Sequence, residues 1–198
     1  LYGGAGNDRF VLNSENLQAL SEAYGTDLNT DQLSRINGGL GFDTITFSGK
    51  NISFDLTKVA NPSALNTDQS SRLNSIEHFD LTGSGDNTLS LSLADLHDLT
   101  GFNWLNSSTA ADLGFNSESY SLSAKEQYRQ LLITGDEGDQ LIFSSNEPEW
   151  TNAGTLTTSN STYDVYNAET TAAQLIVDQN INFDITAPTL SITDDTPG

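Results

Sequence analysis

Four short stretches rich in glycine and acidic residues carry the clearest chemical signal in the sequence. The first, GGAGNDRFV at positions 3–11, fits a nine-residue pattern in which a glycine turn with an acidic end leads directly into a strand and binds Ca²⁺. Glycine adopts backbone angles that other residues avoid, so carbonyl oxygens can converge on an ion, and aspartate adds a hard anionic oxygen. The stretch GGLGFDTI at 38–45 is a near-perfect copy, whereas TGSGDNTL at 82–89 and TGDEGDQL at 134–141 are looser.

The four turns together predict several bound calcium ions; the alternative is four tight turns that hold no ion. The residue at the acidic end of each turn is the expected ligand, and glycine carbonyls are expected to complete the coordination shells. Further carboxylates beside the third and fourth turns are either ligands or solvated turn residues. The predicted metal-binding set is Asp8, Asp43, Asn87, Asp139, Asp86, Asp136, Glu137, Gly4, Gly6, Gly39 and Gly41.

Catalytic chemistry has no comparable signal. The two histidines, His78 and His97, are isolated in the sequence, and neither has the Cys/His neighbours that a zinc site requires. No G-x-S-x-G or similar setting surrounds a nucleophile, and no motif singles out a carboxylate pair for glycoside cleavage. We therefore expect a protein that is not an enzyme.

The charge balance restricts the partners and the compartment. The 198 residues include 27 acidic and 7 basic side chains, a formal net charge of −20, which argues against nucleic acid or an anionic membrane as partner. Such a chain repels itself, so we expect ion binding and folding to be coupled. There is no cysteine and no apolar run near the ~20 residues of a membrane span. Weak sites of this type need calcium at about 10⁻⁴–10⁻³ M, which predicts an extracellular protein.

Strand-like segments follow every glycine turn and set the expected fold. Residues 9–12, 44–47, 88–93 and 140–143 come directly after the turns, and apolar and polar residues alternate at 51–57 and 76–81. Further strands are expected at 130–134, 154–158, 163–167 and 174–178. Short helices are predicted at 14–24, capped by Ser14, and at 92–99, with Ser92 and Asp95 as a capping box.

These elements predict an all-β domain, either a distorted β-sandwich or a solenoid-like stack, with a few short capping helices. Adjacent glycine turns are expected to stack and share calcium. The acidic positions of the turns are 35, 44 and 52 residues apart, too irregular for a regular β-roll.

The long polar and aromatic segment 102–129 is the candidate partner site, because loops of this length inside a compact domain are usually functional. Trp104 and Tyr120 offer a flat apolar surface with a polar tip, and Arg129 can bind a carboxylate through two parallel hydrogen bonds. The alternative is that Trp104 fills the core and Arg129 forms a salt bridge. A capping box at Ser123 and Glu126 predicts one helical turn near the end of the segment.

The chain resembles a module of the RTX (repeats-in-toxin) adhesins, large proteins exported by type I secretion. The resemblance rests on GGAGND, GGLGFD, IEHFDLTGSGDNTL at 76–89 and WTNAG at 150–154. It covers nearly all of residues 3–184, and the ligand-binding domain is placed at 1–186. PTLSITDD at 188–195 is similar to the first strand of a following Ig-like repeat, which places a linker and that strand at 187–198. The chain is accordingly expected to be a piece of a longer protein.

The calcium-dependent peptide-binding domains of those adhesins are similar in size and position. The resemblance implies a secreted or cell-surface module that binds the C-terminal residues of target-cell surface proteins, with Ca²⁺ contacting the terminal carboxylate. An open calcium position could instead take two sugar hydroxyls, so a glycan-binding module is the alternative, and a purely structural spacer is the third.

Overall fold

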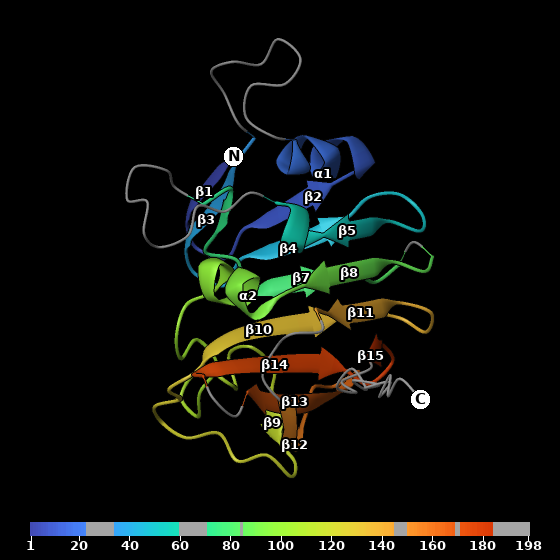
Figure 1. The fold of residues 1–198 in the computed structure, drawn as a ribbon. Helices are drawn as coiled ribbons and strands as arrows, with labels where there is room; N and C mark the ends of the chain where they lie inside the picture. The colour runs from blue at the N-terminus through green and yellow to red at the C-terminus, as the bar shows by residue number, and fades with distance from the viewer. Residues whose placement is uncertain (23–33, 60–70, 84, 145–149, 169–170, 184–198) are drawn as a thin grey trace, which may run out of the picture.

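The computed structural model describes residues 1–22, 34–59, 71–83, 85–144, 150–168 and 171–183, and the fold is mainly β (Figure 1). The chain returns repeatedly to the same sheets, so that each circuit lies on the previous one. We call each circuit a coil. The predicted linker and strand at 187–198 lie outside the described residues, as does the end of the helix predicted at 14–24.

Each sheet collects one strand from successive coils, and the pairing is parallel. The first sheet contains β1 (Tyr2–Ala5), β3 (Ile36–Leu40) and β6 (Leu73–Asn74). The parallel part of the second contains β2 (Arg9–Leu12), β4 (Thr44–Phe47), β7 (His78–Asp80), β10 (Arg129–Thr134) and β14 (Ala173–Asp178). The third contains β5 (Ser53–Asp55), β8 (Thr88–Leu91), β11 (Gln140–Phe143) and β15 (Asn182–Phe183). The circuits β3–β4–β5 and β6–β7–β8 pass through all three sheets, whereas β1–β2, β10–β11 and β14–β15 pass through two.

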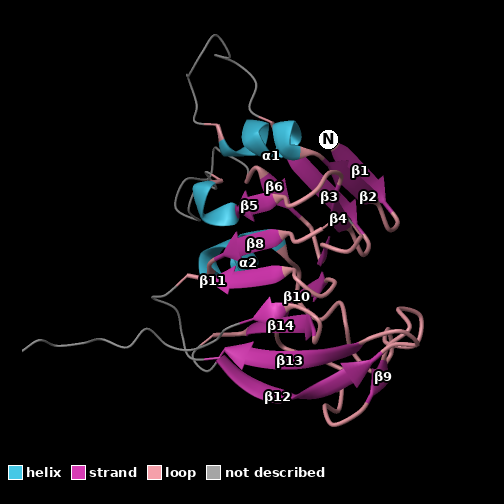
Figure 2. Cartoon of the chain, turned by 90° about the vertical axis from the view of Figure 1, so that its right-hand side faces the viewer, coloured by secondary structure: helices cyan, strands magenta, loops and turns pink. Residues whose placement is uncertain are grey.

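The second sheet continues beyond β14 with antiparallel strands. These are β13 (Thr162–Ala168), β12 (Trp150–Thr157) and β9 (Asn116–Ser117), which complete an eight-stranded sheet. Figure 2 shows the β12–β13 hairpin at the opposite end of the molecule from the first helix. The parallel coils therefore give way to a hairpin at one end.

The core is built from rows of apolar side chains that run across the coils. One row on the second sheet reads Phe10, Ile45, Phe79, Ile133 and Val177 in successive parallel strands, and all five are buried in the main core. Because side chains alternate between the two faces of a strand, the neighbouring positions face outward. The sequence alternation after each glycine turn thus marks which residues the coils enclose.

Two short α-helices cover the coils. The first, α1 (Ser14–Ser21), buries Leu17 and Leu20, but its N-cap is Asn13 rather than the predicted Ser14, because the Asn13 carboxamide accepts from the backbone of Asn16. The second, α2 (Leu93–Leu99), has the predicted capping box: Ser92 and Asp95 bond each other's backbone N–H groups.

Two other predicted elements differ from the structure. The strand predicted at 51–57 is split into β5 and a 3₁₀ turn (Leu56–Lys58), since the Asp55 carboxylate accepts from the backbone N–H of Thr57 and turns the chain. The helical turn predicted at Ser123–Glu126 is absent. Glu126 accepts from the backbone N–H of Ser123 at 2.6 Å, so half of the capping pattern forms without a helix.

A second core lies on the outer face of the second sheet. Segment 102–128 packs there, and its Leu105, Ala110 and Phe115 join the outward row of Leu132 and Ile176. The segment is therefore a packed cover over β10, β14, β13 and β12.

Candidate functional site

The four glycine turns occupy two corners of the coil rather than one stack. The first and second turns join the first sheet to the second, between β1 and β2 and between β3 and β4. The third and fourth turns join the second sheet to the third, between β7 and β8 and between β10 and β11. Adjacent turns were expected to stack. The first stacks with the second and the third with the fourth, but the second and third turns are not neighbours. We call these places the first corner and the second corner.

The first corner contains a column of acidic side chains. The backbone N–H of Asp8 donates to Oδ1 of Asp43 at 2.8 Å, and the N–H of Asp43 donates to Oε2 of Glu77 at 2.9 Å. Glu77 was not among the predicted ligands, because no glycine precedes it. The register of β4 and β7, in which His78 pairs with Thr44 and Phe79 with Ile45, places Glu77 beside Asp43.

One carboxylate oxygen of each aspartate in this corner has no hydrogen-bond partner. Oδ2 of Asp8 and Oδ2 of Asp43 are both buried without a donor, and the Asp43 side chain is fully buried. Burial raises the pKa of Asp43, and the charge of Asp8 raises it further. Burial likewise raises the pKa of Glu77 to about 7. A buried carboxylate oxygen without a donor is costly unless a cation or a proton reaches it.

The glycines of the first corner allow backbone oxygens and carboxylates to approach closely. A Cβ on Gly38 would lie 2.3 Å from Oδ2 of Asp43 and 2.0 Å from the Ser75 carbonyl oxygen. A Cβ on Gly39, whose φ is +103°, would lie 2.1 Å from the Gly4 carbonyl oxygen of the neighbouring coil. Glycine is therefore required where oxygens of two coils gather.

At the second corner, one residue of each coil lies directly before a strand of the third sheet, as Asp8 and Asp43 lie before strands of the second. The hydrogen-bond partners of these residues differ from those at the first corner. The equivalent residues are Ile52, Asn87, Asp139 and Ile181, each directly before or at the start of a strand of the third sheet. Oδ1 of Asn87 accepts from the N–H of Ile52 at 2.8 Å, and its Nδ2 donates to the carbonyls of Leu81 and Gly85 at 2.8 and 3.0 Å.

The carboxylate of Asp139 is also fully engaged at the second corner. Oδ1 accepts from the N–H of Asn87 and Oδ2 from the N–H of Asp136, both at 2.7 Å. Burial raises its pKa, and these two N–H groups oppose that shift. The terminal atoms of Asn87 and Asp139 thus each have at least one hydrogen-bond partner within the protein.

The additional carboxylates predicted near these turns are exposed. Asp86, Asp136 and Glu137 lie on the outside of the second corner, and Oδ2 of Asp136 accepts from the N–H of Gly83 at 2.7 Å. Among the described residues, no three His, Cys, Asp or Glu side chains converge on one point. A cation at the first corner would therefore take much of its shell from backbone carbonyls.

A cleft of about 510 Å³ adjoins the first corner. Its walls include Leu40 from the second turn and Glu77 from the acidic column. Phe102 and Trp104 from the start of segment 102–128, and Arg129 at the start of β10, also line it. Leu40 and Phe102 are 75% and 54% exposed, so the cleft has an uncovered apolar surface. The Arg129 guanidinium lies 4.6 Å from the centre of the Phe102 ring and also donates to the Thr100 carbonyl.

The structure separates the three residues predicted to hold a partner. Trp104 and Arg129 line the cleft, whereas Tyr120 is not among the lining residues. The Tyr120 hydroxyl accepts from Nε2 of Gln174 at 3.0 Å and donates to Glu126, and burial raises the pKa of Tyr120 to about 12.

Buried amides hold segment 102–128 on the sheet. Gln130 and Gln174 are paired on β10 and β14 and are fully buried, and Nε2 of Gln130 donates to Oε1 of Gln174 at 2.8 Å. Oε1 of Gln130 accepts from the N–H of Leu105, and its Nε2 also donates to the Leu105 carbonyl. The indole of Trp104 donates to the Gln130 carbonyl at 2.6 Å. The aromatic wall of the cleft is thereby fixed in place.

An aromatic contact joins the second glycine turn to that wall. The Phe42 ring lies 4.8 Å from the Trp104 ring and 5.6 Å from the His78 ring, between centroids. Phe42 directly precedes Asp43, so the position of the carboxylate and the position of Trp104 are physically linked.

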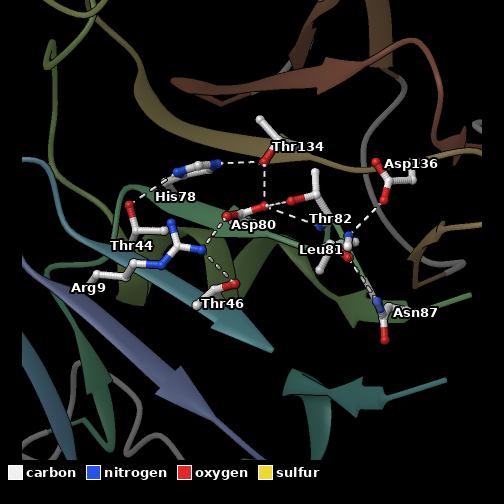
Figure 3. Close-up of polar contacts among 11 residues, drawn as sticks. Arg9, Thr44, Thr46, His78, Asp80, Leu81, Thr82, Asn87, Thr134 and Asp136 are labelled. Atoms are coloured by element: carbon white, nitrogen blue, oxygen red, sulfur yellow. Dashed lines mark hydrogen bonds and ion pairs between the residues drawn. The ribbon is translucent and has the colours of Figure 1, made fainter. Parts of the chain in front are cut away.

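Beside the aromatic contact, a polar network connects four coils across the second sheet (Figure 3). His78 bonds Thr44 through Nδ1 at 3.1 Å and Thr134 through Nε2 at 2.9 Å. Oδ2 of Asp80 pairs with Arg9 at 2.9 Å. Burial lowers the pKa of His78 to about 4, so the ring is neutral at neutral pH. This histidine has its two ring nitrogens occupied by threonine hydroxyls.

A scan against models of protein families gives no match, and searches of curated proteins and of solved structures give none either. No helix among the described residues is long and apolar enough to span a membrane.

Proposed function

We propose that this chain is an extracellular, calcium-dependent adhesion module of the RTX type, built as a solenoid-like stack. In this proposal it binds the C-terminal residues of target-cell surface proteins in the cleft beside the first corner, outside a cell that exports it by type I secretion. The observation that carries the proposal is the position of the cleft, where a calcium-type turn meets Arg129 and an exposed aromatic surface.

The first corner fits a calcium ion. Calcium takes six to eight oxygen ligands with flexible geometry, from carboxylates and backbone carbonyls. The corner offers the unpartnered oxygens of Asp8 and Asp43, with the Gly38 and Ser75 carbonyls beside them. The carbonyls of Gly4, Gly6, Gly39 and Gly41 are the further ligands that the sequence predicts. A bound cation would satisfy the buried oxygens and offset part of the repulsion within the acidic column.

Recognition of a terminal carboxylate needs positive charge, which this chain has in short supply. The formal net charge is −20, so the surface as a whole repels an anionic group. When bound, calcium supplies local positive charge beside the cleft. Arg129 supplies the second positive group, and its stacking on Phe102 and its bond to the Thr100 carbonyl restrict its orientation.

The same geometry accounts for calcium dependence of binding. Leu40 lies in the cleft wall three residues before Asp43, and Phe42 contacts Trp104 one residue before it. Ordering the second turn around an ion would fix the Leu40 wall against the Trp104 wall, which the Gln130 amide already holds in place. Leu40 and Phe102 would then accept an apolar side chain near the end of the peptide.

The proposal is tested by fluorescence polarisation with a library of labelled peptides that have a free or an amidated C-terminus. Binding in calcium, loss of binding in chelator and loss on amidation are expected. Arg129→Met should weaken binding at least tenfold. Lys125→Met removes one exposed positive charge from the same segment outside the cleft and should bind normally.

Equal binding of amidated peptides would refute the carboxylate contact. Competition by a free sugar, with no peptide bound, would instead identify a glycan-binding module. Binding of neither class, with a calcium-dependent melting temperature retained, would identify a structural spacer.

A further inference from the structure

We infer that the side-chain amide of Asn87 takes the place of a calcium ion in the third glycine turn, so that this turn is a latent calcium site that one carboxylate would open. The inference deepens the proposed function and rests on calcium binding at the first corner. It concerns which turns of the chain take up metal and why.

The hydrogen bonds of Asn87 identify its two terminal atoms. The atom that accepts from the Ile52 N–H must be the oxygen, so the other atom is the nitrogen. That nitrogen donates to the carbonyls of Leu81 and Gly85, which belong to the same turn. A donor with partial positive charge therefore sits where two carbonyl oxygens converge, and the side chain is fully buried there.

Asp43 occupies the corresponding place in the second turn with the opposite outcome. Its Oδ1 accepts from the N–H of Asp8 in the coil before, just as Oδ1 of Asn87 accepts from Ile52. Its second terminal atom is an oxygen with no donor, and the Ser75 carbonyl and that oxygen both lie within 2.3 Å of the Cβ position of Gly38. At Asp43 a carboxylate oxygen therefore lies near the Ser75 carbonyl oxygen with no donor, whereas at Asn87 an NH₂ group bonds the Leu81 and Gly85 carbonyl oxygens.

The buried acidic residue of the second corner, Asp139, supports the same difference between the two corners. Both oxygens of Asp139 accept from backbone N–H groups, of Asn87 and of Asp136, so neither is an unpartnered buried oxygen of the kind found at Asp8 and Asp43. The second corner is consequently satisfied without metal, and calcium binding is assigned to the Asp8–Asp43 column. In this inference Asn87 and Asp139 are not ligands, which differs from the sequence-based prediction for these two residues.

The test compares wild type, Asn87→Asp and Asn87→Ala by calorimetric calcium titration and by melting in calcium and in chelator. Asn87→Asp places a carboxylate oxygen against the Leu81 and Gly85 carbonyls. It should melt below wild type in chelator, show a larger calcium-induced shift than wild type, and bind one additional ion. Asn87→Ala should be destabilised equally in both buffers and bind the same number of ions as wild type.

Two results would overturn the inference. Asn87→Asp that gains neither an ion nor a larger calcium shift contradicts the latent site, and Asn87→Ala that loses an ion shows that Asn87 is itself a ligand. If Asn87→Asp is unfolded in chelator, recovery of its circular dichroism on adding calcium is the readout, and no recovery counts against the inference. Absence of calcium binding by wild type would refute the proposed function separately, whatever Asn87→Asp does.

Discussion

Replacing Asp43 by asparagine should destabilise the protein in calcium but not in chelator. In the proposed function Asp43 is a calcium ligand, so in calcium the substitution Asp43→Asn removes a ligand. An ion at about 100 times its Kd contributes about 2.7 kcal/mol, so the variant should lose roughly this amount. For a domain of this size that corresponds to a fall in melting temperature of about 5–11 °C. In chelator the variant should match or exceed wild type, because the buried carboxylate has a raised pKa and an oxygen without a donor.

The measurement is thermal unfolding followed by circular dichroism in 10 mM calcium and in chelator. Asp112→Asn is the matched control, since it neutralises an exposed carboxylate on segment 102–128 and should leave the calcium shift unchanged. The reasoning is refuted if Asp43→Asn loses as much stability in chelator as in calcium, because the carboxylate would then stabilise the fold by itself.

Three further predictions concern the network and the packed segment. His78 has a pKa of about 4 in the folded protein, below the ordinary 6.5, so the unfolded chain takes up a proton first and stability falls as pH decreases from 6.5 to 4. Chemical unfolding across this range should show that the free energy of unfolding falls more steeply for wild type than for His78→Gln, by up to about 3 kcal/mol at pH 4. Identical pH profiles of the two proteins would contradict this prediction. Gln130→Leu should cost about 1–3 kcal/mol in urea unfolding, because it leaves both backbone groups of Leu105 without their partner, and a neutral result would show that the amide ladder does not hold the segment. Arg9→Met should cost less than about 1 kcal/mol because the Arg9 side chain is 59% exposed, whereas Asp80→Ala should cost more, and the reverse order would argue against the network in Figure 3.

The sequence predicts local elements of this fold well, because their causes are local. Strands follow the glycine turns at 9–12, 44–47 and 140–143, as the alternation of apolar and polar residues indicates. The capping box of Ser92 and Asp95 is satisfied within four residues and was correctly predicted. The N-cap at Asn13 was missed by one position, since Asn and Ser cap helices almost equally well and both occur there.

Features that depend on pairing between coils could not be predicted from the sequence. The distance of 44 residues between the second and third turns hides the change of corner, because the chain between them passes through a strand of each of the three sheets before it reaches β7. Glu77 completes the acidic column only through the register of β4 and β7. The cleft is formed by residues far apart in the chain, and nothing near Arg129 in the sequence indicates that it stacks on Phe102.

The side chains that accept backbone N–H groups at the corners also restrict alternative pairings. Similar apolar rows in neighbouring parallel strands would tolerate a slip of two residues, since the same faces would still be buried. Such a slip would remove Asp43 from the Asp8 N–H and Asp139 from the Asn87 N–H, leaving buried donors and acceptors unpaired at both corners. The hydrogen bonds of the corner side chains thus fix the strand register between each coil and the next.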